Sequence, residues 1–479
     1  MGVALDLPLE ALERARFSRD ARFDGRFVVA VLSTHIYCRP ICPVPFASSV
    51  RYYATAAEAA AEGFRPCLRC RPEAAPGSPA WRGTSATVAR ALRLIEEGAL
   101  DKGSVTDLAA RVGVGPRHLN RLMVEQVGAA PLAIAQTRRL HFAKLLLSDT
   151  ALPITEIALA SGYGSVRRFN DAFKDSYRRP PSEIRRRPLA GAAANGITLR
   201  LCYRPPFDWR ETLAFLADEC VPGVERVVGG AYWRALAGAG GPLSVEITDH
   251  PAANALLMRV RGAGPADLIH LATTARRVFD LAADPLQIAD IFRGDPLLGP
   301  LVEARPGLRL IGVWDRFEAV VRAVLDYEKS AAFRRLAGRL AERFGARLDS
   351  EKTGLTRLFP GPRDLAGARL EECGLDLARS ETLRAVAEAV VGGNPPLDDT
   401  AERAVRGLAL IPGFGESRAQ WVGLRGFGEP DAFPGEALVV QRSRSAPGAE
   451  TIGLEGRPEA WRPWRGYGYF HLLAAGRQA

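Results

Sequence analysis

Two closely spaced pairs of cysteines constrain the fold of this 479-residue chain more than any other feature. They form one C-x3-C and one C-x2-C pattern: Cys38, Cys42, Cys67 and Cys70. A short loop between two cysteines directs both sulfurs at one point, and two such loops complete the tetrahedral set that zinc prefers. The spacing predicts one Zn2+ held by four cysteines, with isolated buried thiols as the alternative. Disulfides are disfavoured because no signal peptide is apparent and the other cysteines are scattered singly.

The residues around these cysteines leave two roles open. Closed four-cysteine zinc sites are most often structural. However, Arg39, Arg65, Arg69 and Arg71 flank the sulfurs, and zinc-bound thiolates stay deprotonated at neutral pH, so they are potential nucleophiles.

Roughly residues 10–75 resemble the zinc domain of the bacterial Ada alkylation-response proteins. The resemblance lies in four stretches: Phe27–Thr34, Ile36–Pro40, Cys42 and Gly63–Cys70. It implies that Cys38 accepts a methyl group from a methylated DNA phosphate and that the four cysteines bind zinc. The chain differs from the family at His35, where family members usually have glycine, and in a shorter, less basic stretch at Pro43–Ser49.

The whole chain is too long for a single core, so three or four domains are expected. It contains no apolar run of eighteen residues, which indicates a cytoplasmic protein without a membrane partner. The net charge is +10, and residues 81–190 hold eighteen Lys and Arg against ten Asp and Glu, a balance of +8. This asymmetry favours a polyanionic partner, namely a nucleic acid.

Residues 84–187 show two copies of a helix-turn-helix pattern after a linker at residues 71–83. In each copy a short helical run, a glycine turn and a second helix follow one another, and a helix at about Pro131–Leu147 separates the copies. Short polar and basic side chains on the second helices suit base edges and phosphates: Arg117, His118, Asn120, Arg121, Ser165, Arg167, Arg168 and Asn170. A plain helical bundle with a solvated basic face is the alternative.

The same region resembles the AraC-type transcription regulators. The resemblance rests on the pattern from Ser161 to Lys174 and on Pro180–Arg185. It implies transcription regulation, with RNA polymerase as a protein partner.

Residues 197–310 predict an α+β domain. Alternating apolar residues favour strands, and longer periodic runs favour helices, in these stretches: Ile197–Tyr203, Leu243–Thr248, Ala255–Val260, Trp209–Glu219 and Ala266–Leu281. Periodicity assigns no function to this domain.

Residues 311–479 are expected to be helical, with a hairpin built on Gly413, Phe414 and Gly415. The glycines allow backbone amides to approach a phosphate, and the following helix N-terminus adds positive potential. Several stretches resemble the helix-hairpin-helix DNA glycosylases of the AlkA type: Ile411–Gly415, Leu424–Pro434 and Trp461–Tyr467. The stretches Leu201–Trp209, Pro222–Glu225 and Phe279–Pro285 resemble the amino-terminal domain of that family.

The AlkA resemblance implies flipping of an alkylated nucleotide and hydrolysis of its N-glycosidic bond, as in DNA-3-methyladenine glycosylase II. A carboxylate would stabilise the oxocarbenium-like sugar. The family's Asp falls at Ala437, and Glu436 is the nearest substitute carboxylate. The Trp that stacks on the base in that family falls at Ser417. Its Gly-Gln-Gln segment falls at Asp326–Glu328, and the Trp of its terminal His-x-Trp falls at Leu473. Tyr327 and Trp421 are the candidates for the base pocket, with Trp461 and Trp464 as further aromatic surfaces.

The sequence thus predicts a multidomain α+β protein. Its four domains are a zinc-binding domain, a helix-turn-helix domain, an α+β domain and a glycosylase-type domain, at residues 1–75, 84–187, 197–310 and 311–479. Three hypotheses stay open. The first is a DNA alkylation-response and repair protein that senses methyl-phosphotriesters, regulates transcription and excises bases. The second is a methylation-responsive regulator whose glycosylase-like domain only binds DNA, and the third is a zinc-stabilised DNA-binding protein without chemistry.

Overall fold

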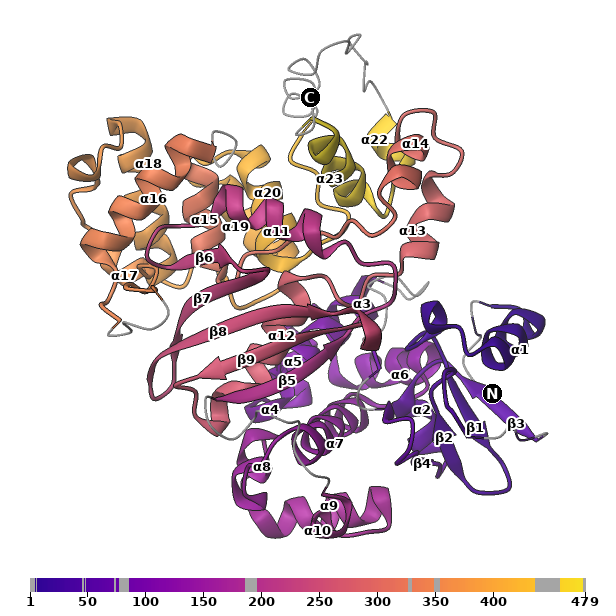
Figure 1. Cartoon of the computed structure of the whole chain (residues 1–479). Helices are drawn as coiled ribbons and strands as arrows, with labels where there is room; N and C mark the ends of the chain where they lie inside the picture. Colours follow the sequence, from indigo (N-terminus) through magenta and orange to yellow (C-terminus); the bar gives the residue numbers. More distant parts are fainter. Residues whose placement is uncertain are drawn as a thin grey trace.

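The structure of the protein is a computed structural model that describes residues 5, 7–44, 47, 49–72, 75–76, 86–185, 196–325, 330–348, 354–435 and 457–476. Separate parts of the chain form a small N-terminal sheet, a larger central sheet and two helical regions (Figure 1). This mixture confirms the predicted multidomain α+β class. None of the helices within these ranges combines the length and apolar character needed to cross a membrane.

The N-terminal part forms a four-stranded sheet in the order β3-β1-β2-β4. Its elements are α1 (Leu9–Ser18), η1 (Ala21–Phe23), β1 (Val28–Val31), β2 (Ile36–Cys38), β3 (Val50–Tyr53), α2 (Ala56–Ala61) and β4 (Arg65–Pro66). β1 pairs antiparallel with β2 and β3, whereas β2 and β4 run parallel, with Tyr37 opposite Pro66. Because parallel neighbours end at one edge of a sheet, the residues that follow β2 and β4 meet there.

The turn between β1 and β2 contains His35, at a position where the Ada family usually has glycine. His35 has a φ of 50°, in the left-handed region that glycine adopts without strain. The His35 ring lies against Phe64, with ring centroids 5.5 Å apart. This ring contact offsets part of the backbone strain.

Two helix-turn-helix motifs follow, as predicted, joined by one long helix. The elements are α3 (Ala86–Glu96), α4 (Ala99–Lys102), α5 (Val105–Arg111), α6 (Pro116–Val127), α7 (Pro131–Asp149), α8 (Ile154–Ala160), α9 (Val166–Tyr177) and α10 (Pro181–Ile184). Buried residues recur every fourth position on α6 and α9, so one face of each helix packs inward and the other faces solvent. Gly113 and Gly162, both with a φ of 79°, make the two turns.

The joining helix α7 is buried in its C-terminal half on every side. All seven residues from Ala143 to Asp149 are at most 5% exposed, including the polar Lys144, Ser148 and Asp149. Such a helix belongs to a core shared by its neighbours. α7 contacts α2 of the N-terminal part and β5 of the central sheet, so it holds three regions of the chain together.

The central sheet has five antiparallel strands in the order β5-β9-β8-β7-β6. Its strands and the helices after and between them are β5 (Ile197–Cys202), α11 (Trp209–Glu219), β6 (Glu225–Val228), β7 (Ala231–Gly238), β8 (Gly241–His250), η3 (Pro251–Ala253), β9 (Ala255–Arg261), η4 (Pro265–Asp267), α12 (Leu268–Val278), α13 (Pro285–Phe292) and α14 (Leu298–Ala304). The sequence prediction found β5, β8 and β9 but missed β6 and β7.

The C-terminal half is helical, as expected. Its elements are α15 (Arg316–Val324), α16 (Ser330–Phe344), α17 (Pro362–Leu365), η5 (Leu370–Cys373), α18 (Leu377–Val391), α19 (Ala401–Ala409), α20 (Glu416–Phe427), α22 (Arg457–Ala460) and α23 (Arg465–Gly476). Most of these helices form their own core, but α23 packs on α14 and shares the core of the central sheet. The domain boundaries drawn from the sequence stay a prediction.

A buried network of ion pairs fastens the central sheet to the C-terminal helices. It consists of three carboxylates and three guanidinium groups, each at most 6% exposed: Glu219, Glu225, Glu318, Arg234, Arg322 and Arg425. The Arg322 Nε donates to Glu318 at 2.9 Å, and Arg425 lies 2.9 Å from Glu219. Arg322 on α15 and Arg425 on α20 thus reach carboxylates on three different elements, because Arg322 also pairs with Glu225 on β6.

Among the described residues, four ion pairs join α3, the residue after it and α5 to the C-terminal half of the chain. They are Arg90–Glu402, Arg93–Glu429, Arg111–Asp399 and Glu97–Arg316, with N–O distances of 2.5 to 3.3 Å. Asp399 and Glu402 lie at the start of α19, whereas the predicted hairpin follows its end. Arg90 and Arg111 therefore contact the end of α19 that is remote from the hairpin, whereas the other two pairs reach α15 and the residues after α20.

Candidate metal centre and nucleic-acid interface

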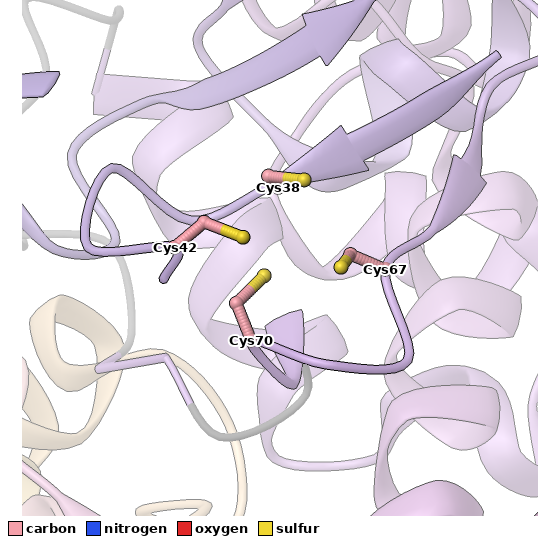
Figure 2. Close-up of side chains that lie close together, drawn as sticks. All are labelled: Cys38, Cys42, Cys67 and Cys70. Carbon is pink, nitrogen blue, oxygen red and sulfur yellow. The ribbon is translucent and has the colours of Figure 1, made fainter. Parts of the chain in front are cut away.

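The two cysteine pairs converge where β2 and β4 end. Figure 2 shows the four side chains pointing toward one another from two loops. Their sulfur atoms all lie within 4.8 Å of one another. Tetrahedral zinc with Zn–S bonds of about 2.3 Å needs sulfurs about 3.8 Å apart, so this cluster fits one Zn2+. Cys38, Cys67 and Cys70 are buried and Cys42 is half-buried.

Strand geometry brings these cysteines together. Cys38 is the last residue of β2, and Cys67 directly follows β4, where its N–H donates to the Tyr37 carbonyl at 2.9 Å. The second member of each pair returns through a tight turn, and Cys42 N–H donates to the Arg39 carbonyl at 3.1 Å. The local sheet, and not the loops alone, therefore fixes the ligand geometry.

The thiols compete for protons. Hydrogen bonding to Cys42 raises the pKa of the Cys38 thiol, and the same pairing lowers the pKa of the Cys42 thiol. A bound dication takes the place of these protons and removes the conflict. The four cysteines hold one Zn2+.

Backbone N–H groups distinguish the four sulfurs. The Arg39 N–H donates to the Cys70 sulfur at 3.3 Å, and the Arg69 N–H donates to the Cys67 sulfur at 3.4 Å. The Val44 backbone hydrogen-bonds to Cys42. Within the described ranges, no backbone N–H donates to the Cys38 sulfur. A hydrogen bond draws electron density from a thiolate, and the Cys38 sulfur is free of this effect from the described backbone.

Two of the four arginines beside the cysteines, Arg39 and Arg71, pair with buried carboxylates. The Arg39 Nε donates to the Asp24 carboxylate at 2.9 and 3.0 Å, and its Nη1 donates to the Cys70 carbonyl at 3.1 Å. Burial alone would lower the pKa of Arg39, but the Asp24 charge raises it overall. Arg71 pairs with the buried Asp149 at 2.8 Å. Both guanidinium groups hold structure, and their charges are matched by carboxylates.

The predicted DNA-facing residues of the helix-turn-helix motifs all lie on solvent-exposed positions: Arg117, His118, Asn120, Arg121, Ser165, Arg167, Arg168 and Asn170. On α6, Arg121 contacts His118 at 3.0 Å and Glu125 at 3.2 Å. The Ser165 hydroxyl caps α9 by accepting the Arg168 N–H at 3.3 Å, so its first role is structural. Their contacts with DNA stay a prediction.

The predicted hairpin joins α19 to α20. Gly413 and Gly415 have φ angles of 79° and 81°, which only glycine adopts readily. A Cβ on Gly413 would lie 2.4 Å from the Thr382 hydroxyl, whereas a Cβ on Gly415 would meet nothing within 4 Å. Phe414 is 1% exposed and packs in the core, so it anchors the turn. Gly415 leaves the open surface at which a phosphate could approach.

The candidate residues for base excision are only partly within the described residues. Tyr327, Glu436 and Ala437 lie outside them. Trp421 is 1% exposed in the C-terminal core, where the Arg425 guanidinium lies 5.1 Å from its ring centre, and its role in a base pocket stays a prediction. Trp461 and Trp464, the further aromatic candidates, are also buried. Ser417, at the expected stacking position, hydrogen-bonds to the Pro434 carbonyl.

The sequence analysis missed three partners of the cysteine cluster. Asp24 pairs with Arg39, Asp149 pairs with Arg71, and His141 contacts the Tyr37 hydroxyl through its Nε2 at 2.9 Å. Asp24 lies between η1 and β1, whereas His141 and Asp149 both lie on α7, and no spacing rule connects these positions to the cysteines. Only the arginines beside the cysteines signalled that carboxylate partners were needed.

Three protein-family models match the chain. The metal binding domain of Ada matches residues 11–73, a helix-turn-helix domain matches residues 108–187, and the AlkA N-terminal domain matches residues 198–315. These three matches follow one another along the chain in the order expected from the sequence.

Three relatives extend this pattern. A probable bifunctional transcriptional activator/DNA repair enzyme AlkA of Mycobacterium tuberculosis is 40% identical over 478 residues, covering 97% of this chain and 95% of that protein. DNA-3-methyladenine glycosylase 2 of Escherichia coli is 35% identical over 280 residues, covering 57% of this chain and 95% of that protein. The bifunctional transcriptional activator/DNA repair enzyme Ada of Escherichia coli is 40% identical over 124 residues, covering 26% of this chain and 34% of that protein.

Proposed function

Since this chain belongs to the family of bifunctional transcriptional activator/DNA repair enzymes of the AlkA type, we propose that it repairs alkylated DNA and regulates the response to alkylation. The zinc-bound Cys38 takes a methyl group from a methylated DNA phosphate. The two helix-turn-helix motifs bind an operator in double-stranded DNA. The C-terminal half binds alkylated DNA in the manner of DNA-3-methyladenine glycosylase II. RNA polymerase is the protein partner that this proposal implies, and the cytoplasm is the expected location.

The methyl transfer is a displacement at carbon. The Cys38 sulfur attacks the methyl carbon, an S–C bond forms, and the C–O bond to the phosphate breaks. The electron pair leaves with the phosphate oxygen, so the triester becomes an anionic diester and the thiolate becomes a thioether. When bound, zinc keeps the sulfur deprotonated at neutral pH.

One observation favours Cys38 as the acceptor. It is the cluster sulfur to which no backbone N–H donates within the described residues, whereas Cys67 and Cys70 each accept one. Cys42 is the rival, because its side chain is more exposed than that of Cys38.

Peptide mass spectrometry after exposure to methyl-phosphotriester DNA tests the assignment. We expect the added mass on the peptide position of Cys38, and we expect Cys38→Ser to lose methyl uptake. A Cys42→Ser variant is the matched comparison, because it removes one zinc ligand but keeps the proposed nucleophile Cys38. Methyl found on Cys42 in the wild-type protein would overturn the choice of residue but leave zinc-dependent transfer intact.

Methylation of Cys38 is expected to raise the affinity for DNA. Four thiolates on one Zn2+ carry a net charge near −2, and a phosphate within about 8 Å feels this charge with little screening. Conversion of one thiolate to a thioether removes about one negative charge and reduces the repulsion. Equal affinities of methylated and unmethylated protein for one duplex would contradict this switch.

The proposed excision of bases by the C-terminal half is expected to be slow. Ala437 stands where the family has Asp, and loss of one such electrostatic partner costs about 100- to 1,000-fold in rate. If Glu436 substitutes, Glu436→Gln abolishes the release of alkylated base and Ala437→Asp adds little. If it does not, Ala437→Asp raises the release and Glu436→Gln changes nothing.

Ala437 also favours a second candidate function. In this alternative the protein is a methylation-responsive regulator whose glycosylase-type half binds DNA without excising bases. An assay for abasic sites in alkylated duplex separates the two functions. Wild-type release as fast as that of a relative with the Asp, unchanged in Glu436→Gln, would show that the site has been placed wrongly.

A further inference from the structure

We propose that Asp24, Gly25 and Arg26 form a joint through which the zinc-bound cysteine cluster and helix α13 stabilise each other. This coupling goes beyond the repair and regulatory functions, because it connects the N-terminal metal centre to the half of the chain that resembles a glycosylase.

One side of the joint is built onto the cluster. Asp24 is 3% exposed and holds the guanidinium of Arg39, the residue that follows Cys38. The Arg39 backbone N–H donates to the Cys70 sulfur, and its side chain donates to the Cys70 carbonyl. Asp24 therefore fixes the backbone on both sides of the metal ligands.

The other side of the joint reaches the central domain. The Arg26 Nε lies 3.0 Å from the Asp284 Oδ2, and this carboxylate is fully buried. The Asp284 Oδ1 accepts the N–H groups of Leu286 and Gln287, each at 3.2 Å, and so caps the first turn of α13. One carboxylate thus uses one oxygen for the helix and the other for the N-terminal domain.

The turn between the two ion pairs is tightly packed against neighbouring atoms. Gly25 has a φ of 75°, and a Cβ at this position would lie 2.2 Å from the Pro76 carbonyl and 3.0 Å from the Arg204 guanidinium. Arg204 is itself fully buried and donates to the Ala283 carbonyl at 3.2 Å, next to Asp284. A displacement of Asp24 is therefore passed to Arg26, because the residue between them cannot move aside.

The cost of breaking the joint is large on the Asp284 side. A buried carboxylate that loses a neighbouring cation is less well compensated in a medium of low dielectric, and Asp284 would then keep the more general attraction of Arg309. Couplings between distinct sites commonly correspond to a factor of about 5 to 150 in an equilibrium constant, and they act equally in both directions. Loss of zinc should therefore loosen α13, and loss of the Asp284 charge should weaken zinc binding.

Hydrogen exchange of the full-length protein, followed by mass spectrometry, tests the first direction. With zinc bound, we expect Arg26→Gln to speed exchange in residues 285–292 by about 5-fold or more. Zinc removal should do the same in the wild-type protein and should add little in Arg26→Gln. The control is Arg22→Gln, which removes an exposed ion pair with Asp20 from the same domain.

Zinc retention against a chelator tests the reverse direction. Asp284→Asn keeps an oxygen for the helix cap and loses only the charge that faces Arg26, so it should release zinc about 5-fold or more sooner. Asp290→Asn, which removes an exposed pair with Arg293, should not. Unchanged exchange in zinc-bound Arg26→Gln, or wild-type zinc retention in Asp284→Asn, would overturn the joint.

Discussion

Substitution of Gly415 by alanine tests whether the hairpin between α19 and α20 binds DNA. Gly415 has a φ of 81° and a ψ of 163°, a combination that is essentially restricted to glycine. Its added Cβ would meet no atom within 4 Å, so the substitution adds backbone strain without a clash. Such strain costs about 1–3 kcal/mol. The hairpin can release it only by rotating its peptide groups away from their present directions.

That rotation should appear as lost affinity. If the hairpin amides face a phosphate, a loss of about 1–3 kcal/mol corresponds to about 5- to 150-fold weaker binding. The quantity to measure is an affinity ratio: the affinity for a duplex with an abasic-site analogue over the affinity for the undamaged duplex. In this ratio the contributions of α6 and α9 cancel.

Gly367→Ala provides the matched control. Gly367 has a φ of 77°, its Cβ would also meet nothing within 4 Å, and it lies between α17 and η5, outside the hairpin. We expect both variants to lower the melting temperature and only Gly415→Ala to lower the affinity ratio. An unchanged ratio in Gly415→Ala, with the same loss of stability as in Gly367→Ala, would refute phosphate binding by the hairpin.

Four further predictions concern stability and metal content. Arg322→Met should lower the free energy of unfolding by about 3–5 kcal/mol, measured by denaturant titration, because it leaves three buried carboxylates with only two guanidinium groups. Burial raises the pKa of Glu225, but the charges of Arg322 and Arg234 lower it by more, so that the pKa is about 2. The stabilising contribution of Glu225 should therefore be lost as the pH falls from about 4.5 toward 2. His35→Gly should change the unfolding free energy by less than about 1 kcal/mol, because relief of strain and loss of the ring contact oppose each other. Cys67→Ala should abolish stoichiometric zinc in metal analysis, and undiminished zinc would contradict the four-cysteine site.

The cysteine cluster and the helix-turn-helix motifs could be predicted because their signals are local. The pairs Cys38–Cys42 and Cys67–Cys70 each span one short loop, and the turn glycines lie between periodic helical runs. The fold class and the zinc site were confirmed for this reason. Strand β6 was missed because it has only four residues, Glu225–Val228, and carries two charged side chains.

What the sequence could not show is which charges meet across the chain. Arg39 and Arg71 stand beside the cysteines, and their carboxylate partners are Asp24 and Asp149. These contacts join residues 15 and 78 positions apart, and one arginine can pair with any of many carboxylates. Pairing between remote residues follows from the packing of whole domains, which local patterns do not encode.

The burial of α7 limits where the DNA specificity of such a protein can change during evolution. The helix α7 contacts both α2 and β5, so an exchange in its buried stretch Ala143–Asp149 alters a helix that packs against the N-terminal part and the central sheet. The solvent-facing positions of α6 and α9 carry no such constraint. New operators can therefore be acquired by substitutions on two short helix faces, while the spacing between these helices stays inherited unchanged.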